Sequence, residues 1–219
     1  MGILGDIWRI LYPVTCPGCG KVMEDSFWCE SCLRKCWNPR MISGSPSKYM
    51  KGCYTLCNYS GGVRNAVIQL KYNGNRARGK SFFDLLNRFP WWERIKDCDL
   101  VLPVPVSKSR RKDRGYNQVD LIFQKWMEQK SMTYLAQGLI CMRHTNTQSL
   151  LTKTERYENM KGVFHINKGI DVKEKNILLV DDVYTTGATM EAAAHELKRA
   201  GAESVIVLFC SACYRQSYN

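Results

Sequence analysis

The stretch that most limits the fold of this chain of 219 residues is "NILLVDDVYTTGATMEAAAHELKRAGA", from Asn176 to Ala202. Its run of consecutive apolar residues is typical of a strand that is buried on both faces, as strands of parallel sheets are. Two aspartates, Asp181 and Asp182, follow directly, and a loop rich in Thr and Gly then leads into a helical pattern. The stretch predicts a strand, a loop and a helix, with two carboxylates where the strand ends.

Similar apolar runs alternate with helical patterns along most of the chain. Strands are expected at "YTLCNYS", "DLVLPVPV", "GLICMRH", "NILLV" and "SVIVLFC", with helices over 63–73, 80–89 and 117–129. The prolines of "DLVLPVPV" indicate that its end is a loop. This alternation predicts the α/β class, a parallel sheet flanked by helices on both faces.

The groups around the aspartate pair suit a sugar phosphate. Carboxylates accept hydrogen bonds from vicinal hydroxyls, and the amides and hydroxyls of a Thr/Gly loop at a helix N-terminus can surround a phosphate. A ribose 5-phosphate has both kinds of group. The alternative is an ordinary strand, turn and helix in which the aspartates cap amides, although capping alone does not explain two consecutive acids followed by TTGAT.

Four of the eleven cysteines form two CxxC pairs separated by nine residues. Two such pairs suit tetrahedral zinc, because each short spacer lets a tight turn direct both thiolates at one ion. A closed site with four thiolates has no position for water, so the expected zinc is structural rather than catalytic. The alternatives are unrelated reduced cysteines or a redox CxxC pair. The predicted ligands are Cys16, Cys19, Cys29 and Cys32, with Cys36, Cys53 and Cys57 left outside the site.

The cysteines also suggest how the chain is divided. The polar stretch "NPRMISGSPSK", over 38–48, is typical of a linker. We therefore expect one unit over 1–48, containing a short N-terminal amphipathic helix, the zinc-binding segment and the linker. A second unit over 49–219 would contain the α/β fold.

Charge and hydropathy limit the partners and the location. The formal net charge of +12 favours polyanions such as nucleic acid, phosphorylated metabolites or an anionic membrane, although a basic protein without such a partner has the same charge. No stretch approaches the ~20 apolar residues of a membrane span. The expectation is a cytoplasmic protein, in which the N-terminal amphipathic helix either packs on its own domain or touches a membrane surface.

The stretch "ILLVDDVYTTGAT" resembles the phosphoribosyl pyrophosphate (PRPP) binding motif of type I phosphoribosyltransferases. The resemblance implies that Asp181 and Asp182 contact the ribose hydroxyls and that Mg²⁺ accompanies PRPP. It also implies that the loop holds the 5-phosphate, through Thr185, Thr186, Gly187, Ala188 and Thr189.

Two further stretches resemble parts of the same enzymes. "VLPVPVSKSRRKDRGYNQ", over 101–118, resembles the strand and loop that hold pyrophosphate, and "RHTNTQSLLTKTERYENMKGVF", over 143–164, resembles a hood that closes over substrate. A surface loop with a short helix is the alternative for the second stretch. The implied residues are Pro105, Val106, Ser107 and Lys108 in the pyrophosphate loop, and Arg143, Gln148, Arg156 and Asn159 in the hood.

With "LKYNG" from Leu70 and the cysteine pairs, these stretches are similar to the ComF family of competence proteins, which joins a zinc-binding segment to a phosphoribosyltransferase domain. One departure is that many relatives have another cysteine pair, where this chain has only Cys53 and Cys57. The resemblance implies a role in natural competence: handling incoming single-stranded DNA at the inner face of the membrane, alongside helicase and recombination proteins.

Two basic stretches flank the expected pyrophosphate loop and could contact either pyrophosphate or a nucleic-acid backbone. The nucleic-acid candidates are Lys71, Arg110, Arg111, Lys112 and Arg114, with Tyr72 and Tyr116 as aromatic neighbours that could stack bases or simply pack. A solvated basic face is the alternative. The competing function is an active phosphoribosyltransferase that passes ribose 5-phosphate from PRPP to a nitrogenous base or amine. A pure transcriptional regulator has less support, because no helix-turn-helix pattern stands out.

Overall fold

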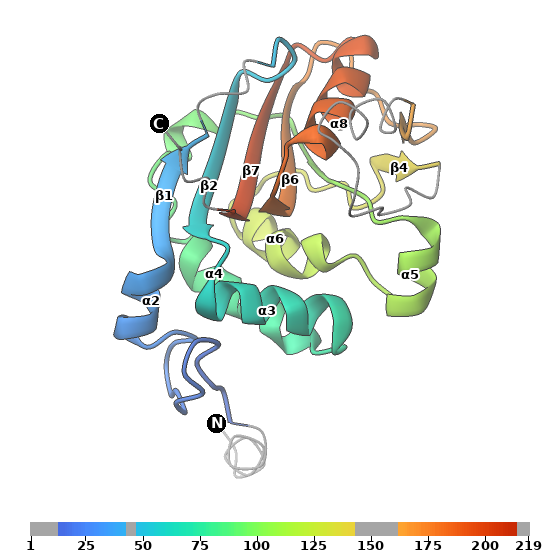
Figure 1. Cartoon of the computed structure of the whole chain (residues 1–219). Coiled ribbons are helices and arrows are strands. Elements are labelled where there is room, and N and C mark those ends of the chain that lie inside the picture. The colour runs from blue at the N-terminus through green and yellow to red at the C-terminus, as the bar shows by residue number, and fades with distance from the viewer. Residues whose placement is uncertain (1–12, 43–46, 143–161, 214–219) are drawn as a thin grey trace, which may run out of the picture.

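A five-stranded sheet forms the centre of the protein in the computed structural model, which describes residues 13–42, 47–142 and 162–213. The strand order is β1-β2-β7-β6-β3. Neighbouring strands from β2 to β3 run parallel, and β1 is an antiparallel edge strand. The α/β class expected from the sequence is thereby confirmed (Figure 1). The bounds are β1 Trp37–Met41, β2 Gly52–Asn58, β3 Leu100–Pro103, β6 Asn176–Tyr184 and β7 Ser204–Ala212.

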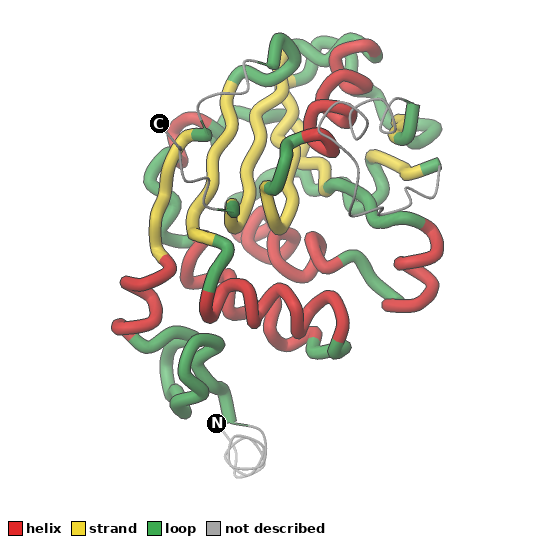
Figure 2. Tube along the Cα trace, in the orientation of Figure 1, coloured by secondary structure: helices red, strands yellow, loops and turns green. Residues whose placement is uncertain are grey.

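Helices cover both faces of this sheet (Figure 2). Because successive side chains of a strand point to opposite faces, Leu178 and Val180 of β6 pack in one buried cluster with α3, α4 and α6. Their neighbours Ile177 and Leu179 pack in a second cluster with α8. The apolar run of β6 is thus buried on both sides. The helices are α3 Gly61–Tyr72, α4 Ser81–Leu86, α6 Gln118–Gln129 and α8 Ala188–Arg199.

Strand β6 is longer than the sequence predicted, and both aspartates lie inside it. The reason is its partner β7, which continues beside it and pairs Asp181 with Phe209 and Tyr184 with Ala212. The expectation that the strand ends at the carboxylates is therefore wrong. The carboxylates still lie near the carboxyl end of β6, and the loop begins at Thr185.

Two helical predictions also differ from the structure. The helix expected over 80–89 is shorter, because a 3₁₀ helix, η1 (Arg76–Lys80), includes its expected first residue and α4 ends at Leu86. A second 3₁₀ helix, η2 (Trp92–Arg94), comes later in the chain. The basic stretch after the pyrophosphate loop forms a helix that was not predicted, α5 (Lys108–Arg114). Its start and end signals are present, since the Ser107 hydroxyl accepts from the Arg110 amide and Gly115 takes the left-handed conformation.

A second, two-stranded sheet lies beside α8. The strand expected at "GLICMRH" exists as β4 (Leu139–Cys141), but it pairs antiparallel with β5 (Phe164–Ile166) and does not join the main sheet. The segment expected as a hood, with Arg143, Gln148, Arg156 and Asn159, lies outside the described residues. So does the expected amphipathic helix at the N-terminus.

The cysteine-rich segment joins the sheet without a break. Helix α2 (Glu30–Cys36) runs directly into β1, which pairs with β2. Residues 38–41 of the expected linker are therefore an edge strand, and the division of the chain near residue 48 stays a prediction. Within the residues described, the chain has no helix with the length and apolar character needed to cross a membrane.

Candidate functional site

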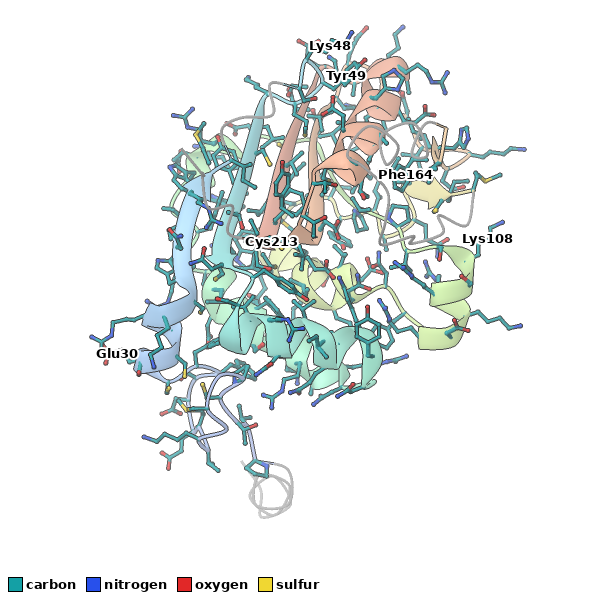
Figure 3. The ribbon with its side chains drawn as sticks, viewed as in Figure 1. Glu30, Lys48, Tyr49, Lys108, Phe164 and Cys213 are labelled. Atoms are coloured by element: carbon teal, nitrogen blue, oxygen red, sulfur yellow. The ribbon has the colours of Figure 1, made fainter. Side chains whose placement is uncertain are left out.

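The parallel strands β2, β7 and β6 end together at one end of the sheet, and the aspartate pair lies near these carboxyl ends (Figure 1). Ligands of open α/β sheets bind just outside the carboxyl ends of the strands. Cys213 follows β7 at the same edge (Figure 3), and its amide donates to the carbonyl of Tyr184 at 3.0 Å.

Asp182 is held by two side chains from other elements. The Lys71 ammonium, at the end of α3, lies 2.9 Å from each carboxylate oxygen of Asp182. The Gln118 amide, at the start of α6, donates to Asp182 Oδ2 at 2.8 Å. Asp182 is only 3% exposed, so these contacts satisfy a buried charge. Although burial opposes its charge, Lys71 has a raised pKa because Asp182 stabilises the ammonium.

Asp181 lies in a different electrostatic setting from its neighbour. One of its oxygens accepts the Asp182 amide at 2.8 Å. Burial, and after it the negative charge of Asp182, raises the pKa of the Asp181 carboxyl to about 8. Near neutral pH the Asp181 carboxyl is therefore mostly protonated.

This raised pKa predicts that Asp181 makes stability depend on pH. Between about pH 4 and pH 8 the folded state keeps a proton that the unfolded state has lost, so the free energy of unfolding falls as the pH rises. Asp181→Asn removes this dependence. We expect the variant to gain on the wild type by up to about 1.4 kcal/mol per pH unit in that window. Urea denaturation at pH 5 and pH 8 measures the effect, and an equal difference at both values would contradict it.

The loop after β6 has the backbone features of a phosphate site. Gly187 is the N-cap of α8 and has a positive φ of 83°, and it offers no side chain to cap the first turn. A Cβ at this position would lie 2.9 Å from the Tyr184 hydroxyl oxygen. Thr185 is exposed and Thr186, Ala188 and Thr189 are half-buried. The Thr186 hydroxyl accepts from the Ala188 amide at 3.5 Å. The start of this helix of twelve residues is a suitable place for an anion.

The expected pyrophosphate loop lies between β3 and α5. Pro105, Val106 and Ser107 are half-buried there, and Lys108 is exposed at the start of α5 (Figure 3). The Asn117 amide, which is 2% exposed, donates to the Val104 carbonyl at 3.0 Å and so anchors the loop to α6.

The motif "RGYNQ" connects this loop to the acid pair. The Tyr116 hydroxyl donates to the Leu70 carbonyl at 2.6 Å, next to Lys71. The Arg114 guanidinium donates to the side-chain oxygen of Gln118, whose amide holds Asp182. The motif thus connects α5, α3 and β6. The sequence alone did not reveal that Asn117 and Gln118 are site residues, because their partners are distant in the chain.

The five nucleic-acid candidates fall into two groups. Arg110, Arg111 and Lys112 are exposed on α5. Lys71 and Arg114, in contrast, are half-buried and belong to the network around Asp182. The charges of Lys71 and Arg114 are therefore available both to a ligand bound at the acid pair and to a ligand on the surface.

The four cysteines of the two CxxC pairs meet at one point, with all their sulfurs within 4.8 Å of one another. Cys29 Sγ lies 3.8 Å from Cys16 Sγ and 3.7 Å from Cys19 Sγ. The first pair is carried by a tight turn, in which the Gly20 amide donates to the Cys16 carbonyl at 2.9 Å. The second pair begins α2. Four convergent thiols are the donor set of structural zinc, so the cluster fits such an ion.

Negative charges on neighbouring thiols of the cluster repel one another. Burial opposes ionisation of Cys16, but hydrogen bonds from the backbone at Cys29, Cys19 and Gly18 outweigh it and lower its pKa to about 6. Burial and the neighbouring thiols raise the pKa of Cys32 to about 12. A bound cation would relieve this repulsion and let all four ionise. Cys36, Cys53 and Cys57 lie outside the cluster, as expected.

The cysteine segment is fastened to the α/β unit by contacts that the sequence did not reveal. The Trp28 indole donates to the Ser81 carbonyl at 2.7 Å, and the Phe27 amide donates to Asp84 Oδ2 at 2.8 Å. Gly62 of α3 permits close approach, since a Cβ there would lie 2.7 Å from the Gly18 Cα. The position of this segment therefore depends on the fold of the cysteine turn.

Comparison with known proteins places this arrangement in a class. The family model of the phosphoribosyl transferase domain matches residues 133–218, which include the acid pair and its loop. With its mixed sheet and flanking helices, the α/β unit has the type I phosphoribosyltransferase fold, preceded by a four-cysteine segment.

The chain is also similar to competence and DNA utilization proteins over most of its length. It is 31% identical over 200 residues to Competence protein F of Haemophilus influenzae, covering 88% of this chain and 82% of the relative. Competence protein ComFC of Bacillus subtilis is 28% identical over 195 residues, covering 89% and 75%. DNA utilization protein YhgH of Shigella flexneri is 27% identical over 197 residues, covering 88% and 81%. The chain belongs to the ComF family of competence proteins.

Proposed function

We propose that this protein acts in natural competence, binding PRPP at the acid pair and contacting incoming single-stranded DNA. The observation that carries the PRPP part is the acid pair beside the N-terminus of α8, in a domain of phosphoribosyltransferase type. The ribose hydroxyls would contact Asp181 and Asp182, and the 5-phosphate would lie in the loop 185–189. The pyrophosphate would lie against the loop 105–108.

Magnesium and zinc have separate places in this proposal. Mg²⁺ prefers oxygen ligands and keeps several waters, so it would be held mainly by the oxygens of PRPP. Zinc would be held by the four thiolates and would act only on structure. The Lys71 ammonium lies on Asp182, so the hydroxyls of PRPP would have to share or replace that contact.

The DNA part is supported by charge and by relatives. Relatives of this chain are named as competence and DNA utilization proteins. The net charge of +12 and the exposed cations of α5 favour a polyanion. The setting that we propose is cytoplasmic, at the inner face of the membrane, alongside competence helicase and recombination proteins.

A transformation assay tests the role. A strain that lacks this chain is expected to lose transformation and to regain it with the wild-type gene. The proposal expects no recovery from a gene carrying Asp181→Asn and Asp182→Asn together, provided that the variant accumulates to the wild-type level. Full recovery with that gene would show that PRPP binding is not needed for the role.

Turnover of labelled PRPP separates the proposal from its alternative, an active phosphoribosyltransferase. The acid pair would be used in both, so binding alone does not distinguish them. Release of pyrophosphate that depends on an added base or amine, and that stops in the double variant, would favour the enzyme. Binding without release across a panel of acceptors favours the competence role.

A further inference from the structure

The aromatic side chain of Tyr72 does not pack in the hydrophobic core. It is the last residue of α3 and is 76% exposed. The other Phe, Tyr and Trp side chains of the described residues are buried or half-buried. An exposed tyrosine ring at a helix end has a free face, which is the geometry that an unpaired base can stack on.

One cation lies over this ring, and a second lies over the nearby ring of Tyr116. The Arg114 guanidinium carbon lies 5.9 Å from the centre of the Tyr72 ring. The Arg76 guanidinium lies 4.6 Å from the centre of the Tyr116 ring, whose hydroxyl is bonded to the last turn of α3. Two arginine and tyrosine pairs are therefore joined at one place. The stretch 60–80 has five basic residues and no acidic one.

We propose that Tyr72 and the cations around it form a stacking platform for single-stranded DNA, and that bound PRPP weakens this contact. Arg76, Arg111 and Lys112 are exposed and would contact the backbone phosphates. A single strand suits the platform better than a duplex, because a duplex has its base faces already stacked. This inference rests on the proposed function and specifies where it takes place.

The link to PRPP runs through cations that both ligands use. The Arg114 guanidinium contacts the Tyr72 ring and also donates a hydrogen bond to Gln118, which in turn donates one to Asp182. Lys71 precedes Tyr72 on α3 and is ion-paired with Asp182. A PRPP polyanion at the acid pair would draw on both positive charges and leave less attraction for a strand on the platform. By linkage, bound single-stranded DNA weakens the binding of PRPP by the same factor.

Fluorescence anisotropy with a labelled oligothymidylate of about 16 nucleotides tests the platform. Tyr72→Ala is expected to raise the Kd at least about fivefold at fixed salt, the low end of one lost stacking contact. The slope against salt should be unchanged, because no charge is removed. Tyr72→Phe keeps the ring and should stay near the wild type. Met41→Ala, at an exposed residue of β1, is the matched control.

Each result has a separate meaning. No binding by the wild type at low salt would overturn the DNA part of the proposed function and the platform with it. Binding that Tyr72→Ala leaves unchanged, or a duplex that competes as well as the strand, would overturn the platform alone. Saturating PRPP with Mg²⁺ should raise the wild-type Kd about fivefold or more, but not that of the Asp181→Asn, Asp182→Asn variant. An unchanged wild-type Kd would overturn the coupling.

Discussion

Cys29→Ser is expected to unfold the cysteine segment and to detach it from the α/β unit. Cys29 Sγ lies 3.8 Å from Cys16 Sγ and 3.7 Å from Cys19 Sγ, so the variant loses one of the four convergent ligands. Zinc binding contributes about 10 to 16 kcal/mol in small zinc peptides, which the few buried residues of this segment cannot replace. Serine is a good N-cap, and Cys29 is the N-cap of α2. The loss would therefore not be due to a weaker helix start.

Metal content, near-UV circular dichroism and tryptophan fluorescence would measure this effect. The wild type is expected to hold one zinc per chain and to lose the signal of buried Trp28 when a strong chelator removes it. Cys213→Ser is the matched control, because Cys213 is exposed and outside the cluster. A metal-free Cys29→Ser protein with an unchanged melting temperature would refute the structural role of the cluster.

Asp181→Asn together with Asp182→Asn is expected to weaken PRPP binding at least about a hundredfold, because both side chains lose hydrogen bonds with the ribose hydroxyls and those to the Asp182 carboxylate are charge-assisted. The matched control is Asp97→Asn with Asp99→Asn. It replaces the same number of carboxyl groups just before β3, at the amino end of that strand, whereas the site lies at the carboxyl end. Isothermal titration measures both. If the acid-pair variant bound PRPP with wild-type affinity, the acid pair would not be the PRPP site.

This variant also breaks a buried ion pair, so its fold needs a separate check. Removing the Asp182 charge leaves the Lys71 ammonium without its carboxylate, which is costly in a buried setting. Thr185→Val supplies a second variant outside that pair. Thr185 is exposed, so the fold should be unaffected, and losing its hydroxyl should weaken PRPP about tenfold. Unchanged affinity in a folded Thr185→Val protein would show that this hydroxyl does not contact the phosphate.

Local patterns were sufficient to predict much of this fold. The apolar runs located strands of the parallel sheet, and the CxxC spacing identified the four sulfurs that meet. Both patterns depend on residues that are near one another in sequence. The length of β6 was missed because pairing with β7 extends it past the aspartates, and hydrophobicity does not report that pairing.

The partners of the acid pair could not be predicted, for a related reason. Lys71 is 111 positions from Asp182, and Gln118 is 64 positions away. A charge pattern can mark Lys71 as basic, but only the packing of α3 against β6 shows that its ammonium lies on a carboxylate. Helix α5, in contrast, has local start and end signals in the sequence, namely Ser107 and Gly115.

Calorimetric titration of the wild-type protein with PRPP and Mg²⁺ tests the central claim most directly, with ribose 5-phosphate and pyrophosphate as separate ligands. The acid pair, the loop 185–189 and the loop 105–108 predict saturable binding of one PRPP per chain. They also predict weaker binding of either fragment, since each fragment would occupy only part of the site. No saturable binding of PRPP, or pyrophosphate alone binding as tightly as PRPP, would contradict the account.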